Sequence, residues 1–351
     1  MTVKRDFIEA CYGRPVGRRP IWIMRQAGRY QASYRAVRTK HSFDELCHTP
    51  ELAAQVTLDA VRQFDLDAAI IFSDIMVILP PMGLPVTFAP GPKIAVPIRR
   101  PDQIARLKPL DPRADVGYVM NALRQVRAAL PEPVGLIGFS GAPFTLACYA
   151  IEGETSREYP TARQFFYREP DAAEQLMKHF ADAIADYLNA QIDAGADAVQ
   201  LFDSWGGLLS AADYRRWVLP HMQAIIAKIR RPNVPVILYV NGSSHLVDAL
   251  SDTRCDVVSV DWRTDLPAAA AKCAKQTALQ GNLDPVALLG TPDEIRRRVD
   301  TIVDEMDTTG KGHVFNLGHG ILPPTPEENL RVLVEHVHAR RPRLQTAGND
   351  Q

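Results

Sequence analysis

Arginines crowd the segment RQAGRYQASYRAVR (25–38), which directly follows the apolar run PIWIM (20–24) and contains no acid. Arg25 and Arg29 flank Gly28, and a glycine lets the backbone approach a ligand closely. A guanidinium group binds a carboxylate through two parallel hydrogen bonds. We interpret Arg25 and Arg29 as a local site for a carboxylate-bearing ligand, with ion pairs to acids elsewhere in the fold as the alternative. Arg35 and Arg38 either extend this basic rim or are solvated surface charges.

The chain as a whole shows no such excess of charge. In 351 residues, 40 Lys and Arg face 41 Asp and Glu, so no global field attracts nucleic acid or an anionic membrane. No apolar stretch reaches the roughly 18 residues that span a bilayer, and MTVKRDFIEA lacks the apolar core of a signal peptide, which predicts a cytoplasmic protein. The five cysteines form no C-x-x-C pair and are expected to be reduced thiols.

Eight short apolar runs predict strands that are buried on both faces. They lie at 20–24, 67–73, 134–139, 197–202, 234–240, 255–260, 277–281 and 313–318. Helical periodicity separates most of them, most clearly at 292–306 and 326–340. This alternation predicts an α/β fold, a (β/α)8 TIM barrel, in a single domain over 1–351. An open doubly wound sheet is the alternative, but no G-x-G-x-x-G follows the first run.

Two segments are predicted to lie outside this alternation. The Pro-rich stretch 79–101 is expected to be a long loop after the second strand, and the polar, aperiodic tail 342–351 is expected to fray.

In such a barrel the catalytic face is formed by the loops at the carboxyl ends of the strands. Polar side chains gather there in this sequence, among them Asp74, Tyr149, Ser204 and His319. Asp203 or Ser204 could instead cap a helix, and the pair Asp284-Pro285 has the character of a turn. Neither an H-E-x-x-H zinc motif nor a G-x-S-x-G nucleophile elbow occurs in the chain.

Two long segments, PIWIMRQAGRY (20–30) and GFSGAPFTLACYAIEG (138–153), resemble the signature segments of the uroporphyrinogen decarboxylase family. The agreement continues in order through 70–79, 200–207, 280–285 and 316–326. The resemblance implies a homodimeric (β/α)8 barrel that needs no cofactor and no metal. It also implies a lyase of porphyrin and haem biosynthesis, which converts the four acetate side chains of uroporphyrinogen III to methyl groups and gives coproporphyrinogen III.

The same resemblance assigns roles to individual residues. Asp74 corresponds to the central aspartate that receives the pyrrole N–H groups, and we name Asp74 and Arg25 as the catalytic residues. The residues expected to bind the tetrapyrrole substrate are Arg25, Gln26, Ala27, Gly28, Arg29, Asp74, Tyr149, Ser204 and His319. Position 205 departs from some family members, because Trp stands here where they have His.

Two other functions remain open. A cobalamin- or thiol-linked methyltransferase is similar in sequence and shares the barrel, but it holds zinc through His and Cys at strand ends, and neither YVNG nor NLGHG contains a cysteine. A non-catalytic tetrapyrrole carrier would share the arginines and the cavity, and only turnover separates it from an enzyme.

Overall fold

A computed structural model describes residues 5–88, 91–229 and 232–340 of the chain. The tail predicted to fray, 342–351, lies outside the described residues.

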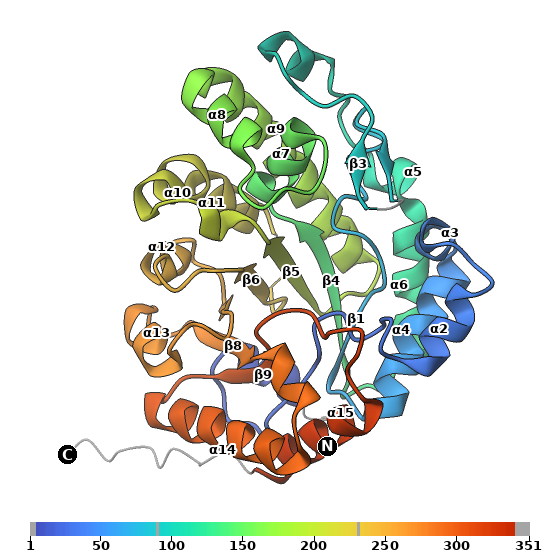
Figure 1. Cartoon of the computed structure of the whole chain (residues 1–351), viewed down its shortest axis with the longest axis vertical. Coiled ribbons are helices and arrows are strands. Elements are labelled where there is room, and N and C mark those ends of the chain that lie inside the picture. Colours follow the sequence, from blue (N-terminus) through green and yellow to red (C-terminus); the bar gives the residue numbers. More distant parts are fainter. Residues whose placement is uncertain (1–4, 89–90, 230–231, 341–351) are drawn as a thin grey trace.

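Seven parallel strands form a curled sheet in the order β1-β4-β5-β6-β7-β8-β9 (Figure 1). Their bounds are β1 Ala68–Ile70, β4 Gly135–Gly141, β5 Ala198–Asp203, β6 Val236–Val240, β7 Val257–Ser259, β8 Ala278–Leu283 and β9 His313–Leu317. Every residue of β4, β5, β6 and β9 is buried. The apolar runs at 134–139, 197–202, 234–240 and 313–318 are therefore confirmed as strands covered on both faces.

The first predicted strand, 20–24, is not a strand in the structure. Ile21 forms a single parallel bridge with Phe315 of β9. On its other side the Ile21 carbonyl accepts a hydrogen bond of 2.9 Å from the backbone N–H of Asp67, just before β1. The segment lies between the two edge strands, and its short contact with each explains why the sheet itself counts seven strands.

Helices surround the strands on the outside (Figure 1). The longer ones are α4 Pro50–Phe64, α6 Gly117–Ala129, α7 Pro143–Glu152, α9 Pro170–Asp193, α11 Leu219–Lys228, α14 Pro292–Thr309 and α15 Glu327–Ala339. The shorter ones are α1 Asp6–Cys11, α2 Ala32–Arg38, α3 Phe43–His48, α5 Pro112–Asp115, α8 Pro160–Arg168, α10 Ala211–Trp217, α12 Val247–Asp252 and α13 Leu266–Lys272. The described part of the chain also contains the 3-10 helices η1 Pro101–Arg106, η2 Gly206–Leu208 and η3 Pro285–Leu289.

The carboxyl-terminal helices follow the sequence pattern directly. In α14, Ile295, Val299, Ile302 and Val303 are buried, and the Thr291 hydroxyl caps the helix by accepting from the backbone N–H of Glu294. Among the residues that the structure describes, no helix is long and apolar enough to cross a membrane.

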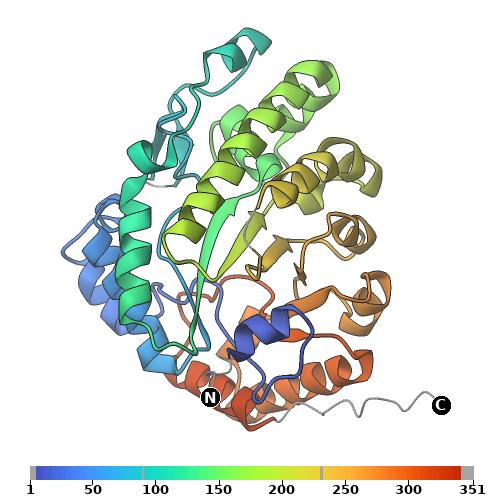
Figure 2. The ribbon, with the colours of Figure 1, turned by 180° about the vertical axis from the view of Figure 1, so that it is seen from behind.

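Two segments lie outside the alternation of strands and outer helices. The helix α1, deep blue in Figure 2, lies against the amino-terminal ends of the strands, where Phe7 packs so close to Gly135 that a Cβ there would meet its ring at 2.4 Å. The Pro-rich loop differs from its prediction as a plain loop, because Val86–Thr87 (β2) and Lys93–Ile94 (β3) pair in it as an antiparallel hairpin.

Inside the sheet, four side chains form a buried polar chain. Trp22 donates from Nε1 to Gln280 (2.8 Å), whose amide in turn donates to Gln200 (3.1 Å) and Ser259 (2.9 Å). An unpaired polar group in a core is costly, so these bonds stabilise the packing of the segment 20–24. They link it to β8 through Gln280, and from there to β5 and β7 across the interior of the sheet.

Candidate functional site

A cavity of about 610 Å³ opens at the carboxyl ends of the strands, within the usual size range of a small-molecule site. All nine residues that the sequence names for binding line it, as do the apolar Ile70, Met76 and Phe202. Among the described residues, its lining carries three arginines, Arg25, Arg29 and Arg38, and a single carboxylate, Asp74. The site is thus locally cationic in a chain of net charge −1.

The backbone around Arg25 is held in an unusual conformation. Arg25 has φ of 65°, in the left-handed region that a residue with a side chain seldom adopts. The preceding residue is fixed on both sides: the Met24 N–H donates to Asn316 Oδ1 (3.0 Å), and the Met24 carbonyl accepts from the N–H of Ile321 (2.9 Å). The Arg25 side chain crosses Gly320, where a Cβ would stand 2.4 Å from its Cδ. Gly320 therefore leaves the space that Arg25 occupies.

The rest of the arginine segment is a tight turn. The Tyr30 hydroxyl donates to the Gln26 carbonyl (2.7 Å), and the Gly28 carbonyl accepts from the N–H of Gln31 (3.0 Å). Arg35 does not line the cavity, because its guanidinium donates to the carbonyls of Arg29 (2.9 Å) and Tyr30 (2.6 Å). Arg35 was expected either to extend the basic rim or to be a solvated surface charge. In the structure it stabilises this turn instead.

Arg38 is the other of those two arginines, and it joins the cavity. It comes from α2, and its Nη1 also donates to the carbonyl of His41. The guanidinium is therefore anchored at the cavity wall by its own helix end.

Asp74 follows β1 and sits among apolar residues of the cavity. Its Oδ1 accepts from the backbone N–H of Met76 (2.8 Å), an Asx-type turn, and in the described part of the chain no further hydrogen bond reaches this carboxylate. Burial raises the pKa of Asp74 from 3.8 to about 6, against the opposing effects of the Met76 bond and of Arg25. The ionised form still predominates at pH 7, which lies above this pKa. The cavity thus offers one under-satisfied carboxylate as a hydrogen-bond acceptor.

His319 follows β9 and is neutral. Burial, with Arg25 and Arg263 nearby, lowers its pKa from 6.5 to about 4. Its Nδ1 accepts from the N–H of Gly320 (2.7 Å), so the ring proton is on Nε2. A neutral imidazole with this tautomer is a hydrogen-bond donor at Nε2.

Tyr149 of α7 and Ser204 after β5 also line the cavity, whereas Asp203 does not. Asp203 is fully buried and accepts at Oδ1 from the Thr145 hydroxyl (2.7 Å). Burial raises its pKa to about 6. Asp203 thus joins β5 to α7 and does not face the cavity.

The sequence analysis did not foresee an aromatic wall of the cavity. The ring centroid of Tyr34, on α2, lies 5.7 Å from that of Phe72. The ring centroid of Phe43, on α3, lies 5.8 Å from that of Phe72 and 5.2 Å from that of Phe88. All four rings line the cavity. The available signal was the presence of aromatics in and near the arginine segment, but Tyr34 and Phe43 on short helices are equally typical of core, and Phe72 and Phe88 lie in segments without regular structure.

The family model for uroporphyrinogen decarboxylase (URO-D) matches residues 2–340. The chain belongs to the uroporphyrinogen decarboxylase family. Curated relatives named uroporphyrinogen decarboxylase include those of Trichlorobacter lovleyi, 46% identical over 332 residues that cover 95% of this chain and 97% of the relative, and of Chloroflexus aggregans, 47% identical over 339 residues that cover 95% of each.

Solved structures extend the likeness to the fold. A methyltransferase from Methanosarcina mazei aligns with a TM-score of 0.79 at 20% identity, covering 95% of this chain and 97% of that one. A B12-independent methionine synthase from Shewanella aligns with a TM-score of 0.57 at 11% identity, covering 92% and 95%. The uroporphyrinogen decarboxylase family thus shares its curled α/β fold with methyltransferases.

Two other acids at strand ends, Asp284 after β8 and Asp261 after β7, do not line the cavity. Asp284 caps η3 by accepting from the N–H of Val286 (2.9 Å), which confirms its role in a turn. Asp261 accepts from the backbone N–H groups of Gly242 and Arg263, the latter at 2.8 Å. All five cysteines are free and buried, as expected. Within 5–88, 91–229 and 232–340, no three His, Cys, Asp or Glu side chains form a group that could hold a metal ion.

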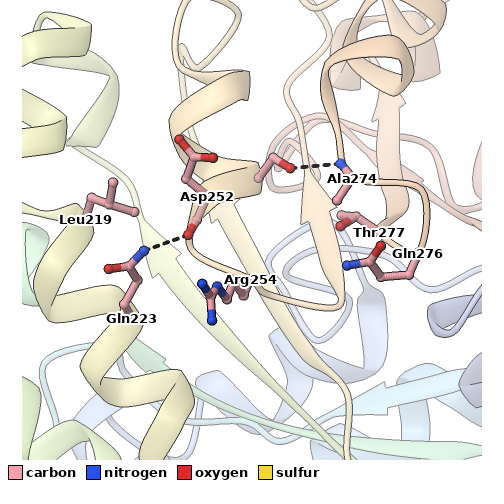
Figure 3. Close-up of a pocket in the computed structure, with 8 residues that line it drawn as sticks. Leu219, Gln223, Asp252, Arg254, Ala274, Gln276 and Thr277 are labelled. Carbon is pink, nitrogen blue, oxygen red and sulfur yellow. Dashed lines mark hydrogen bonds between the residues drawn. The ribbon is translucent and has the colours of Figure 1, made fainter.

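A second cavity, of about 660 Å³ (Figure 3), shares no lining residue with this site. Its lining precedes β7 and β8 or belongs to α11, so it lies toward the amino-terminal ends of the strands. Gln223 donates there to the Asp252 carbonyl (2.8 Å), and the Ala274 N–H donates to the Ser251 hydroxyl (2.9 Å). These polar groups already pair with one another, and the cavity shares no residue with the family motifs.

Proposed function

We propose that this protein removes CO2 from the four acetate side chains of uroporphyrinogen III and yields coproporphyrinogen III. The observation that carries the proposal is a cavity with three arginines around one under-satisfied aspartate. Uroporphyrinogen has eight carboxylates around four pyrrole N–H groups. A cationic rim with a central acceptor complements that distribution.

In this proposal the rim holds carboxylates and the centre holds the ring. Arg25, Arg29 and Arg38 bind acetate and propionate groups, since planar guanidinium donors match carboxylates. Neutral His319 donates from Nε2, and the Tyr149 and Ser204 hydroxyls complete the polar contacts. Gln26, Ala27 and Gly28 bring their turn of backbone against the substrate. The aromatic wall formed by Tyr34, Phe43, Phe72 and Phe88 packs against the macrocycle.

The proposed chemistry uses a pyrrole ring as the electron sink. Protonation of a pyrrole carbon next to the acetate-bearing carbon gives a ring cation. The bond between the acetate methylene and its carboxylate then breaks, CO2 leaves, and the electron pair forms an exocyclic double bond that neutralises the ring. A proton added to the exocyclic carbon creates the methyl group, and loss of the ring proton restores the pyrrole. The net change for each acetate is one proton consumed and one CO2 released.

Asp74 stabilises the cationic ring in this scheme. Its carboxylate accepts hydrogen bonds from the pyrrole N–H groups, and its negative charge opposes the positive charge that develops on protonation. The apolar surroundings that raise its pKa also strengthen this interaction, because they exclude water. Arg25 is proposed to deliver the proton, directly or by organising water, although a guanidinium holds its protons tightly.

We further propose that the protein acts without cofactor or metal, as a homodimer of single-domain subunits in the cytoplasm. The proposal extends to a closed (β/α)8 barrel in which 20–24 serves as the eighth strand, supported by its contacts with β9 and with Asp67. The homodimer rests on the family resemblance, and the oligomeric state is measured by light scattering of the purified protein.

The test of the function is anaerobic incubation of purified, chelator-treated protein with uroporphyrinogen III, followed by oxidation and chromatography of the porphyrins. We expect species with seven, six, five and then four carboxyl groups. Tight binding with all eight carboxyl groups intact would contradict the proposal and identify a carrier.

A further inference from the structure

Tyr149 faces the cavity with two aromatic neighbours behind it. The ring of Tyr159 lies 5.8 Å from that of Tyr149, and the ring of Trp205 lies 6.1 Å away, both in edge-on contact. Tyr159 and Trp205 themselves are 4.7 Å apart. Of the three, Tyr149 alone lines the cavity. Tyr149 is therefore the member of this cluster that can contact a bound ligand.

Both neighbours carry a buried donor that has no partner. The Tyr159 hydroxyl and the Trp205 Nε1 are without a hydrogen bond to any described residue. A buried donor left unpaired costs the full desolvation of that group, so such a donor in a folded chain calls for a partner. The Tyr149 hydroxyl is the polar group of this cluster that reaches the cavity. Burial raises the pKa of Tyr149, and Tyr159 and Trp205 act in the opposite direction, as hydrogen-bonding neighbours do.

The backbone holds both neighbours in place independently of Tyr149. The Trp205 N–H donates to the Thr145 hydroxyl (3.3 Å), which donates to buried Asp203 (2.7 Å). Thr145 precedes Tyr149 by one turn on α7, so both side chains lie on the same face of that helix. Tyr159 has φ of 46°, and its N–H donates to the Ser156 hydroxyl (3.2 Å).

We propose that Trp205 and Tyr159 are positioning residues that donate hydrogen bonds to the Tyr149 oxygen and so commit the Tyr149 proton to the substrate. A phenol has one proton and two lone pairs, and an indole N–H can only donate. Once Trp205 occupies a lone pair, the Tyr149 proton points into the cavity, where a substrate carboxylate accepts it. This inference rests on the proposed function, because it requires that Tyr149 contacts a carboxylate of the substrate.

The test is a double-mutant cycle with decarboxylation as the readout. Trp205→Phe keeps an aromatic ring and removes the N–H, and we expect about a fivefold loss in kcat/KM, mainly through a higher KM. In a Tyr149→Phe background the same substitution should cost less than about twofold, since the group that it supports is gone. Tyr159→Phe should show the same dependence on Tyr149.

Trp217→Phe is the matched control. Trp217 is also packed against aromatic rings, Phe166 and Tyr167, but it does not line the cavity. Its kcat/KM should stay within twofold of the unaltered protein. Equal losses for Trp205→Phe in both backgrounds would overturn the inference, because they would show a general structural role. If Tyr149→Phe itself has no effect, the Tyr149 contact and this inference both fall, while CO2 release by the unaltered protein leaves the proposed function standing.

Discussion

The Asp74→Asn substitution tests the electrostatic role of the central carboxylate. Asn keeps the size of the side chain and an oxygen that can still accept from the N–H of Met76, but it removes the negative charge. If Asp74 stabilises a ring cation in the transition state, kcat should fall by about 100- to 1,000-fold, the usual cost of removing one such group. A retained rate within threefold of the unaltered protein would refute the reasoning.

The same substitution should stabilise the fold. The difference between a pKa of 3.8 and one of about 6 corresponds to about 3 kcal/mol against the ionised form in the folded state. Because the folded pKa is raised, this penalty is fully present above pH 6, declines between pH 6 and 3.8, and is absent below. Asp74→Asn should therefore raise Tm by a few degrees at pH 8 and leave it unchanged near pH 4.

The assays are rapid product chromatography across pH 5–8 and thermal unfolding in the same buffers. In the unaltered protein, kcat/KM should fall as the pH drops through about 6, when Asp74 takes up a proton. Asp203 also has a pKa of about 6 but lies outside the cavity. Asp203→Asn should therefore keep the fall of kcat/KM below about pH 6, the acid limb of the pH profile. Asp284→Asn, which alters only a cap of η3, should keep both the rate and the limb. An acid limb that persists in Asp74→Asn and disappears in Asp203→Asn would contradict the assignment.

Four further predictions concern the rim. Arg25→Lys should lower kcat at least tenfold if Arg25 handles the proton, and near-normal turnover would end that role. Gly320→Ala places a Cβ 2.4 Å from Arg25 Cδ and should lower kcat/KM more than tenfold, whereas Gly117→Ala, with nothing within 4 Å, should leave it unchanged. His319→Gln should raise KM without altering the pH profile between 5.5 and 8, because its pKa of about 4 lies outside that window; a profile that changes would contradict this. Arg38→Gln should raise KM severalfold and weaken its dependence on salt, and a KM within twofold of normal would remove Arg38 from the site.

The fold could be predicted from the sequence where burial alone decides the structure. The runs that became β4 through β9 are mostly apolar and buried along their whole length, so composition sufficed. The run at 20–24 looks the same but forms only one bridge, because its backbone N–H and C=O groups also bond Asp67 and side chains such as Asn316. Its pairing depends on tertiary contacts that no local pattern records.

In the candidate site, too, some features could be predicted from the sequence and others depend on tertiary contacts. The positions of Asp74, Tyr149 and His319 follow from the rule that loops at the carboxyl ends of strands meet. Side-chain direction does not follow from that rule. Arg35 and Arg38 are three residues apart on one helix, yet the first turns back to two carbonyls and the second lines the cavity.

The central claim is that this cavity converts acetate groups to methyl groups, and counting CO2 tests it most directly. Purified protein is incubated anaerobically with uroporphyrinogen III carrying labelled acetate carboxyl carbons, and the CO2 released per macrocycle is measured. The account predicts four CO2 for each coproporphyrinogen formed, with release lowered at least a hundredfold in Asp74→Asn. Bound substrate without released CO2, or release that does not depend on Asp74, would contradict it.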